Sequence, residues 1–224
     1  MFDMRFLDEI REAELETVVP RLPAGGAVLE IGGGTGAQAL SLERRGFRVA
    51  SVDLPSSLYR FRRVFPVVEY DGTRLPFPDR SFDAAYSSNV LEHVTDPAPL
   101  HAEIRRVLRP GGRGIHVMPS ASWRFFSSLT YYFVLPPKAY RRLAGIPPGP
   151  NDLPAAPVSS STPGLLSLAI SRILPPRHGE QGSSFGELFG FRTATWVRHF
   201  REHGMTVLVV EPTGIFYTGE MALG

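Results

Sequence analysis

Residues 28–36 constrain the fold of this chain more than any other stretch. Three of the first four are apolar and partly β-branched (Val28, Leu29 and Ile31), which predicts a strand buried on both faces. A glycine cluster follows, and 37–45 then has the composition of a helix. Glycines let the backbone approach a ligand closely, and the free N–H groups at the start of a helix face that ligand. A strand, a glycine turn and a helix in this order therefore predict a site for a nucleotide-like cofactor.

The glycine turn by itself fits three interpretations. Gly32, Gly34 and Ala37 fit the dinucleotide pattern G-x-G-x-x-G/A of NAD-binding proteins. The same two glycines with Gly36, preceded by Glu30, fit equally well the E/D-x-G-x-G-x-G loop of class I S-adenosylmethionine (SAM) methyltransferases. A tight turn between strand and helix that binds nothing is the third interpretation.

The residues after the turn distinguish these interpretations. An alternating run at 47–52 predicts a second strand, which ends at Asp53, where a carboxylate can accept both hydroxyls of a ribose. The other characteristic elements are a strand at 67–70 ending at Asp71, an L-P-F-x-D-x-S-F-D run at 75–83, Asn89 to His93, an L-R-P-G-G turn at 108–112 and a strand at 113–118. In this order and spacing, residues 26–118 resemble the class I SAM-dependent methyltransferase superfamily, specifically the small-molecule branch called methyltransferase type 11. A dehydrogenase has no reason to contain the L-P-F and L-R-P-G-G elements, so NAD is disfavoured.

The resemblance implies an α/β, Rossmann-like fold with seven mostly parallel strands and flanking helices. Five parallel strands are expected from 27–118, and a helix at 193–203 should precede a terminal antiparallel hairpin made by 205–210 and 215–218. We expect a single domain, 1–224, composed of a cofactor-binding core at 1–118, an insertion or lid at 119–192, and a C-terminal helix and hairpin at 193–220.

The same resemblance implies where SAM binds. Glu30 is expected to anchor the glycine loop and reach the methionine amine, Asp53 to bind the ribose hydroxyls, and Asp71 to accept the adenine amino group. The other expected cofactor contacts are Gly32, Gly34, Gly36, Leu54, Gly72, Ser88 and Asn89. Because the SAM sulfonium already makes the methyl group electrophilic, the protein mainly has to align the acceptor and exclude water, and S-adenosylhomocysteine is the expected product.

The histidines are candidates for general-base chemistry. A hydroxyl acceptor needs a base, whereas a stabilised carbanion needs less help. His93 follows the fourth strand at the edge where acceptors bind and is the first candidate, unless it only shapes the pocket. His178, in a polar turn of the insertion, is the second, with a surface histidine as the alternative. His116 is expected to be structural. No metal site is expected, because His199 and His203 lie on a charged helix that favours a solvated face.

Basic residues are concentrated in one part of the chain. Residues 104–179 contain ten Lys or Arg and one acid, Asp152, a net charge of +9, and the rest of the chain has a net charge of −7. The insertion opens with an aromatic run at 123–135, followed by Lys138, Arg141 and Arg142. A proline-rich linker at 145–164 and a short apolar helix at 165–174 are expected next. The simpler interpretation of the insertion is a lid over the cofactor. The more specific interpretation is a lid whose face at 123–142 also contacts a membrane or a lipid-linked acceptor.

Composition narrows the remaining choices. A chain of 224 residues that is 43% hydrophobic can bury one full core, and the absence of cysteine excludes disulfides and thiolate zinc sites. No run reaches the roughly 18 apolar residues of a membrane span, and 1–19 predicts a packed amphipathic helix rather than a signal peptide. The expected location is the cytoplasm, with peripheral contact to a membrane.

These observations together predict methyl transfer from SAM to a small or lipid-linked acceptor, foremost O-methylation of a saccharide or polyketide-type hydroxyl. C-methylation of a prenylated quinone is the enzymatic alternative. The alternative from another class is a non-catalytic SAM-binding partner subunit. Nucleic acid is not an expected partner, because residues 87–90 read S-S-N-V in place of the N-P-P-[YF] motif of base methyltransferases. The sequence leaves the oligomeric state open.

Overall fold

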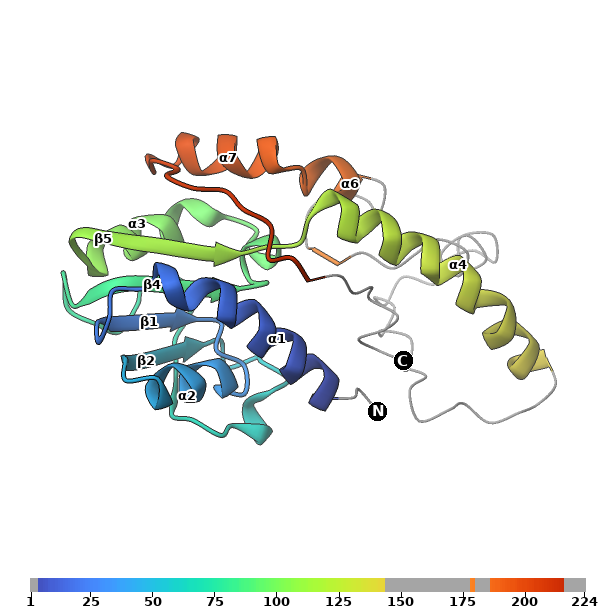
Figure 1. Cartoon of the computed structure of the whole chain (residues 1–224), viewed down its shortest axis with the longest axis horizontal. Coiled ribbons are helices and arrows are strands. Elements are labelled where there is room, and N and C mark those ends of the chain that lie inside the picture. Colours follow the sequence, from blue (N-terminus) through green and yellow to red (C-terminus); the bar gives the residue numbers. More distant parts are fainter. Residues whose placement is uncertain (1–3, 144–177, 180–185, 216–224) are drawn as a thin grey trace. The chain divides into compact units, whose positions relative to one another are not determined.

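A computed structural model describes residues 4–143, 178–179 and 186–215 of the chain (Figure 1). The described residues belong to two compact units. The sheet unit contains 8–118 and 199–215, and the insertion unit contains 4–7, 119–143, 178–179 and 186–198. Each unit is described by itself. A single domain with an insertion at 119–192 stays a prediction.

The sheet unit is built on five parallel strands. They are β1 (Ala27–Ile31), β2 (Arg48–Asp53), β3 (Val67–Glu69), β4 (Phe82–Ser88) and β5 (Leu108–Val117). Their order in the sheet is β3-β2-β1-β4-β5, and every neighbouring pair is parallel. The five strands expected from 27–118 are thus confirmed. The chain moves outward from β1 to β3 and then returns to β4 on the other side of β1, and ligands of such sheets bind at the carboxyl ends of the strands near this reversal.

The described helices include those expected within 1–19, 37–45 and 193–203. They are α1 (Met4–Val18), α2 (Ala37–Arg44), α3 (Pro97–Val107), α4 (Ala121–Leu143), α6 (Gly186–Gly190) and α7 (Thr193–Glu202), with short 3-10 turns at Val19–Arg21, Arg60–Arg62 and Leu91–His93. Asp96 caps α3, because its side chain accepts a hydrogen bond from the Ala98 N–H and Pro97 occupies the first helical position. The linker and the helix expected at 145–164 and 165–174 lie outside the described residues.

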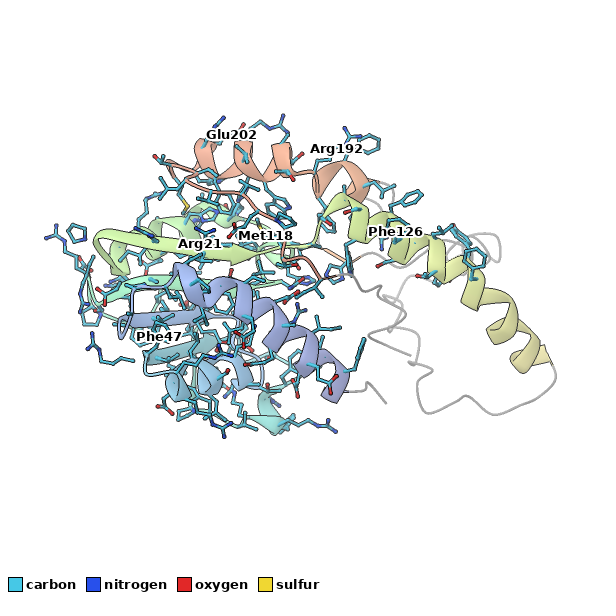
Figure 2. All side chains as sticks on the ribbon, in the orientation of Figure 1. Arg21, Phe47, Met118, Phe126, Arg192 and Glu202 are labelled. Atoms are coloured by element: carbon cyan, nitrogen blue, oxygen red, sulfur yellow. The ribbon has the colours of Figure 1, made fainter. Side chains whose placement is uncertain are left out.

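Helices cover both faces of the sheet because neighbouring strand residues point to opposite sides. On one face, side chains of α1 and α2 pack against alternate residues of β1, β4 and β5; the cluster contains Leu15, Val18, Leu22, Val28, Leu42, Phe47, Ala84, Tyr86 and Val117 (Figure 2 labels Phe47). On the opposite face, α3 buries Leu100, Ile104 and Val107. The L-R-P-G-G element, expected to be a turn, lies inside β5 as a bulge: Phe82 is opposite Leu108 but Ala84 is opposite Arg113.

The terminal hairpin expected from the sequence is not formed by the described residues. Residues 205–215 contain no strand, so the sheet has five strands there instead of seven. Leu208, Val209 and Val210 are 72%, 57% and 57% exposed, whereas a strand added to this sheet would bury alternate side chains. Alternating apolar residues favour an extended chain, but they do not specify a partner strand. Most of the second expected strand, 216–218, lies outside the described residues.

Among the described helices, none combines the length and the apolar character needed to cross a membrane. The longest, α4, has 23 residues and interrupts its aromatic run with serines and threonine.

Candidate functional site

The glycine loop joins β1 to α2 and closes against the loop that follows β4. Gly32 has a φ of +73°, and a Cβ built on it would lie 2.4 Å from a methyl carbon of Val90. A Cβ on Gly33 would lie 1.9 Å from the Ser51 hydroxyl oxygen. Larger residues would therefore push the loop away from β2 and β4. The loop lies at the point where the strand order reverses, which is where this class of sheet binds ligands.

Glu30 lies beneath this loop, in β1. Its side chain is buried, and one carboxylate oxygen accepts a hydrogen bond of 2.5 Å from the hydroxyl of Ser51, its neighbour in β2. Burial, and to a smaller extent the negative charge of Asp53, raise the pKa of Glu30 to about 7 against the opposing effect of the Ser51 hydrogen bond. The position agrees with the expected anchoring role, although contact with a methionine amine stays a prediction.

Asp53 ends β2 beside the glycine loop. Its two carboxylate oxygens accept hydrogen bonds from the backbone N–H of Gly34, at 3.0 Å, and from that of Leu54, at 2.8 Å. An ionised carboxylate has about four acceptor positions, so two remain for ligand hydroxyls after these bonds. Asp53 therefore fixes the glycine loop and has the capacity for the expected ribose contact.

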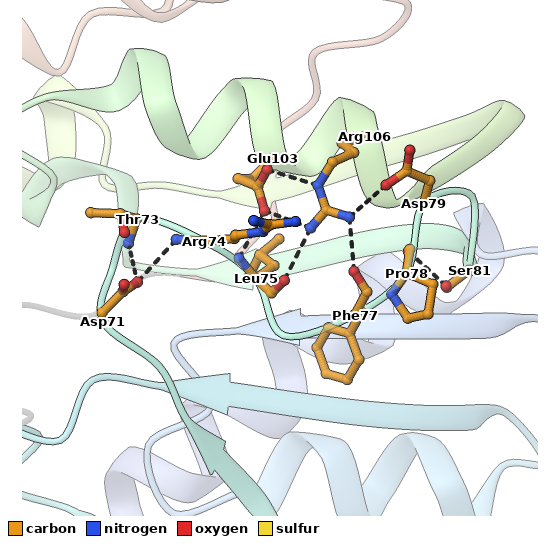
Figure 3. Close-up of polar contacts among 10 residues, drawn as sticks. All are labelled: Asp71, Thr73, Arg74, Leu75, Phe77, Pro78, Asp79, Ser81, Glu103 and Arg106. Atoms are coloured by element: carbon orange, nitrogen blue, oxygen red, sulfur yellow. Dashed lines mark hydrogen bonds and ion pairs between the residues drawn. The ribbon is translucent and has the colours of Figure 1, made fainter.

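Asp71 and Gly72 bring the end of β3 to the same edge. One oxygen of Asp71 accepts from the N–H groups of Thr73 and Arg74 at 2.8 and 3.0 Å (Figure 3), and these bonds lower the pKa of Asp71 to about 2. A Cβ on Gly72 would lie 3.1 Å from a methyl of Leu54, so the ends of β2 and β3 are in contact.

Tyr70 was not singled out from the sequence, yet it lies between the two acids. Burial raises its pKa first, and the charges of Asp53 and Asp71 then raise it further. The sequence feature that could have identified Tyr70 is its position directly before Asp71.

The L-P-F-x-D-x-S-F-D run is held by α3 rather than by the glycine loop. Arg106 donates to the carbonyl oxygens of Leu75 and Phe77 at 3.0 and 2.8 Å (Figure 3). The same guanidinium forms ion pairs with Asp79 at 2.8 Å and Glu103 at 2.6 Å. This motif therefore fixes the segment that leads from the Asp71 turn into β4.

Ser88 and Asn89 end β4, and α1 reaches them. The Ser88 hydroxyl donates to the carboxylate of Glu14 at 3.0 Å and accepts from the Asn89 amide at 3.1 Å. Glu14 is buried and paired with Arg11 at 2.6 Å. The sequence analysis missed both α1 residues. The signal was an acid on the apolar stripe of the helix, four residues after Ile10.

The two candidate bases belong to different units. His93 lies in the turn after β4, and its side chain is 43% exposed. His178 belongs to the insertion unit, where its ring is half-buried and packs edge-on against Trp123 at a centroid distance of 4.6 Å. The N–H groups of His178 and Gly179 each donate to the Glu187 carboxylate at 2.8 Å. The polar turn expected around His178 is therefore a packed element of its unit.

Several of the basic residues at 104–179 have structural partners. Arg109 pairs with Asp83 at 2.6 Å, and Arg105 donates to the carbonyl oxygen of His203. Arg124 and Glu187 form an ion pair of 2.8 Å whose side chains are 4% and 1% exposed. Arg124, which lies within the segment 123–142, is therefore held inward by the buried Glu187.

A hollow of about 360 Å³ lies at the opposite end of the sheet from the glycine loop. It is lined by Asp79, Arg80, Arg105, Arg106, Leu108, Arg109 and Pro110. These residues flank the first residues of β4 and β5, so the hollow is not part of the cofactor edge.

The expectation that His199 and His203 lie on a solvated face is wrong. Both are half-buried because this face of α7 packs on His101 of α3, which is fully buried. Burial, and then the neighbouring histidines, lower the pKa of His101 to about 3. His116, expected to be structural, is half-buried in β5: its Nδ1 lies 2.8 Å from the Ser87 hydroxyl, and burial lowers its pKa to about 4.

Comparison with known proteins agrees with this geometry. Residues 29–115 match the family described as "Methyltransferase domain". These residues belong to the class I SAM-dependent methyltransferases. The resemblance found in the sequence is thus confirmed, and SAM is the cosubstrate of this family.

The relatives of this methyltransferase domain cover only part of the chain. An uncharacterized methyltransferase of Mycobacterium sp. (strain KMS) is 41% identical over 97 residues, covering 42% of this chain and 38% of the relative. A demethylmenaquinone methyltransferase of Tropheryma whipplei (strain Twist) is 34% identical over 122 residues, covering 50% and 51%. A SAM-dependent methyltransferase structure from Mesorhizobium loti has a TM-score of 0.44 at 27% identity, over 50% of this chain and 55% of that one. The chain thus spans about two fifths to one half of the length of these curated relatives.

Proposed function

We propose that this chain transfers a methyl group from SAM to a small-molecule acceptor. The observation that supports this most is the meeting of three strand ends: the glycine loop after β1, Asp53 and Leu54 after β2, and Asp71 and Gly72 after β3. A glycine loop closed against β2 and β4, next to a carboxylate with spare acceptor positions, fits a ligand that contains a ribose.

When bound, SAM would supply an electrophilic methyl group on a sulfonium. The chain's own residues would bind and orient it. Asp53 would accept the ribose hydroxyls, Leu54 and Gly72 would border the adenine, and Glu30 would hold the loop that faces the methionine end. Ser88 and Asn89, fixed by Glu14, would border the same end.

The acceptor belongs to the proposal as well. O-methylation of a saccharide or polyketide-type hydroxyl is the first candidate, with His93 as the base that removes the hydroxyl proton. C-methylation of a prenylated quinone is the second, and a specific observation favours it: two of the similar proteins are named demethylmenaquinone methyltransferases, from Corynebacterium kroppenstedtii and Tropheryma whipplei.

Turnover with a panel of acceptors tests both candidates. The purified chain is incubated with SAM and hydroxyl, amine or quinone acceptors, and S-adenosylhomocysteine and methylated product are detected by mass. If the acceptor is a hydroxyl, His93→Gln should reduce kcat roughly 10²- to 10⁴-fold, since general-base catalysis contributes about that much. Equal kcat in wild type and His93→Gln would contradict a base role for His93. Binding of SAM without turnover of any acceptor would favour the non-catalytic partner subunit.

We also propose that α4 contacts a membrane surface or a lipid-linked acceptor. Phe125, Leu129, Tyr132 and Phe133 follow one helical stripe by their spacing in α4, and Phe126 is next to Phe125 in the chain (Figure 2 labels Phe126). They are 52%, 42%, 40%, 73% and 39% exposed respectively. Exposed aromatic stripes of this kind are typical of helices that lie in a lipid interface.

A further inference from the structure

Three histidines that are distant in the sequence converge in the sheet unit. His101 comes from α3, His199 comes from α7, and His203 is the residue that follows the end of α7. The Nε2 atoms of His101 and His199 lie 2.9 Å apart. One nitrogen from each of the three rings falls within 4.8 Å of the others.

The rings converge without stacking on one another. Their centroids are 5.1 Å apart for His101 and His199, 5.0 Å for His101 and His203, and 4.5 Å for His199 and His203. The corresponding interplanar angles are 64°, 54° and 40°. None of the three pairs is therefore stacked face to face, and the convergence of the nitrogens rests on their mutual distances of at most 4.8 Å.

The tautomer of His203 suits a metal ligand. Its Nδ1 lies 2.7 Å from the carbonyl oxygen of His199, so Nδ1 carries the proton and donates it, which leaves the lone pair on Nε2. Histidines that bind metals are usually oriented by a hydrogen bond of this kind from the other ring nitrogen.

Access differs among the three side chains in a way that suits an ion. His101 is fully buried, whereas His199 and His203 are half-buried, so the cluster is partly accessible to solvent. Three imidazoles with one remaining open position are a known ligand set for Zn²⁺, and imidazole also suits Ni²⁺ and Cu²⁺.

We propose that His101, His199 and His203 form a binding site for a divalent transition metal, with Zn²⁺ as the ion that the ligand set suits best. The ion would join α7 to α3. The site lies on α3 and α7 rather than at the strand ends that form the cofactor edge, so this proposal is independent of the proposed function.

Calorimetric titration of the full chain with ZnCl₂ tests the site. The protein is prepared without a polyhistidine tag and freed of metal with a chelator. We expect one Zn²⁺ per chain with micromolar or tighter affinity, a rise in the melting temperature with Zn²⁺, and visible absorption typical of four-coordinate Co²⁺ when Co²⁺ replaces it. His203→Gln and His199→Gln should each lose this binding, whereas Glu43→Gln, which removes an exposed carboxylate on α2, should keep it.

Failure of the wild type to bind Zn²⁺ at micromolar concentration would overturn the proposal, and the three histidines would then form only a hydrogen-bonded contact between helices. Retention of full affinity in both His199→Gln and His203→Gln, or an equal loss of binding in Glu43→Gln, would overturn it too. Circular dichroism of each metal-free variant shows whether it has folded. If one of the two cluster variants does not fold, the other variant and the Co²⁺ spectrum of the wild type decide.

Discussion

Glu30 is the residue whose chemistry depends most on its surroundings. It is buried under the glycine loop with a hydroxyl as its hydrogen-bond donor, and burial raises its pKa to about 7. A carboxyl whose pKa is raised on folding binds more protons in the folded state than in the unfolded state. Protonation of Glu30 therefore stabilises the folded state, and this stabilisation is lost as the pH rises from about 4.5 to about 7.

Glu30→Gln should remove this pH dependence. Because glutamine does not ionise, we expect the variant to gain stability relative to wild type as the pH rises, by up to about 3 kcal/mol at pH 8. The free energy of unfolding, measured with denaturant at several pH values, checks this. Glu43→Gln, on the exposed side of α2, is the matched control and should show no such trend. A constant difference between Glu30→Gln and wild type from pH 5 to pH 8 would contradict the assignment.

Asp53 is the residue on which cofactor affinity should depend most. Asp53→Ala removes charge-assisted hydrogen bonds worth roughly 1.5–3 kcal/mol, so affinity for S-adenosylhomocysteine should fall about ten- to hundredfold. Since the side chain also accepts from the Gly34 N–H, the melting temperature without ligand should fall slightly as well. Calorimetry measures the affinity, with Glu43→Ala as the control. Unchanged affinity in Asp53→Ala would show that the ribose lies elsewhere.

At the scale of elements, α4 carries four exposed aromatic side chains among the described residues: Phe125, Phe126, Tyr132 and Phe133. If its stripe enters a lipid interface, the full chain should float with vesicles that contain anionic lipid at low salt and be released as salt rises, because the Debye length shortens to about 8 Å at physiological ionic strength. The double variant Phe125→Ser, Phe133→Ser should lose vesicle binding, and so should Arg141→Glu with Arg142→Glu.

Phe61→Ser is the control for that experiment, because Phe61 is 81% exposed but lies in the sheet unit. Its vesicle binding should equal that of wild type. Wild-type protein that stays unbound at every salt concentration, or an equal loss in Phe61→Ser, would leave α4 as part of a lid only.

The elements near the cofactor edge were predictable because their signals are local. Glycines at positions of positive φ, acids at strand ends and the proline after Asp96 each specify the backbone within a few residues. The terminal hairpin was not predictable in the same way. The run at 205–210 has strand composition, but a strand also needs a partner edge, which no local pattern in that run defines.

At the scale of the whole molecule, what the sequence could not show depends on distant contacts. His101 and His199 are 98 positions apart and meet only because α3 and α7 pack on the same face of the sheet. Glu14 and Ser88 are 74 positions apart and meet because α1 reaches the end of β4. In both cases the residue types were visible in the sequence, but their proximity required the topology. The identity of the cofactor could be predicted without the topology, because the motifs at 30–36, 75–83 and 108–112 were sufficient.

Thermal unfolding with S-adenosylhomocysteine and, separately, with NADH tests the central claim most directly. Binding to the folded chain alone should stabilise it by about 2.7 kcal/mol when the ligand is present at a hundred times its Kd. We predict a rise in melting temperature with S-adenosylhomocysteine that increases with its concentration, and no change with NADH. No shift with S-adenosylhomocysteine at any concentration, or a clear shift with NADH, would contradict the assignment of the edge formed by the glycine loop, Asp53 and Asp71 as a SAM site.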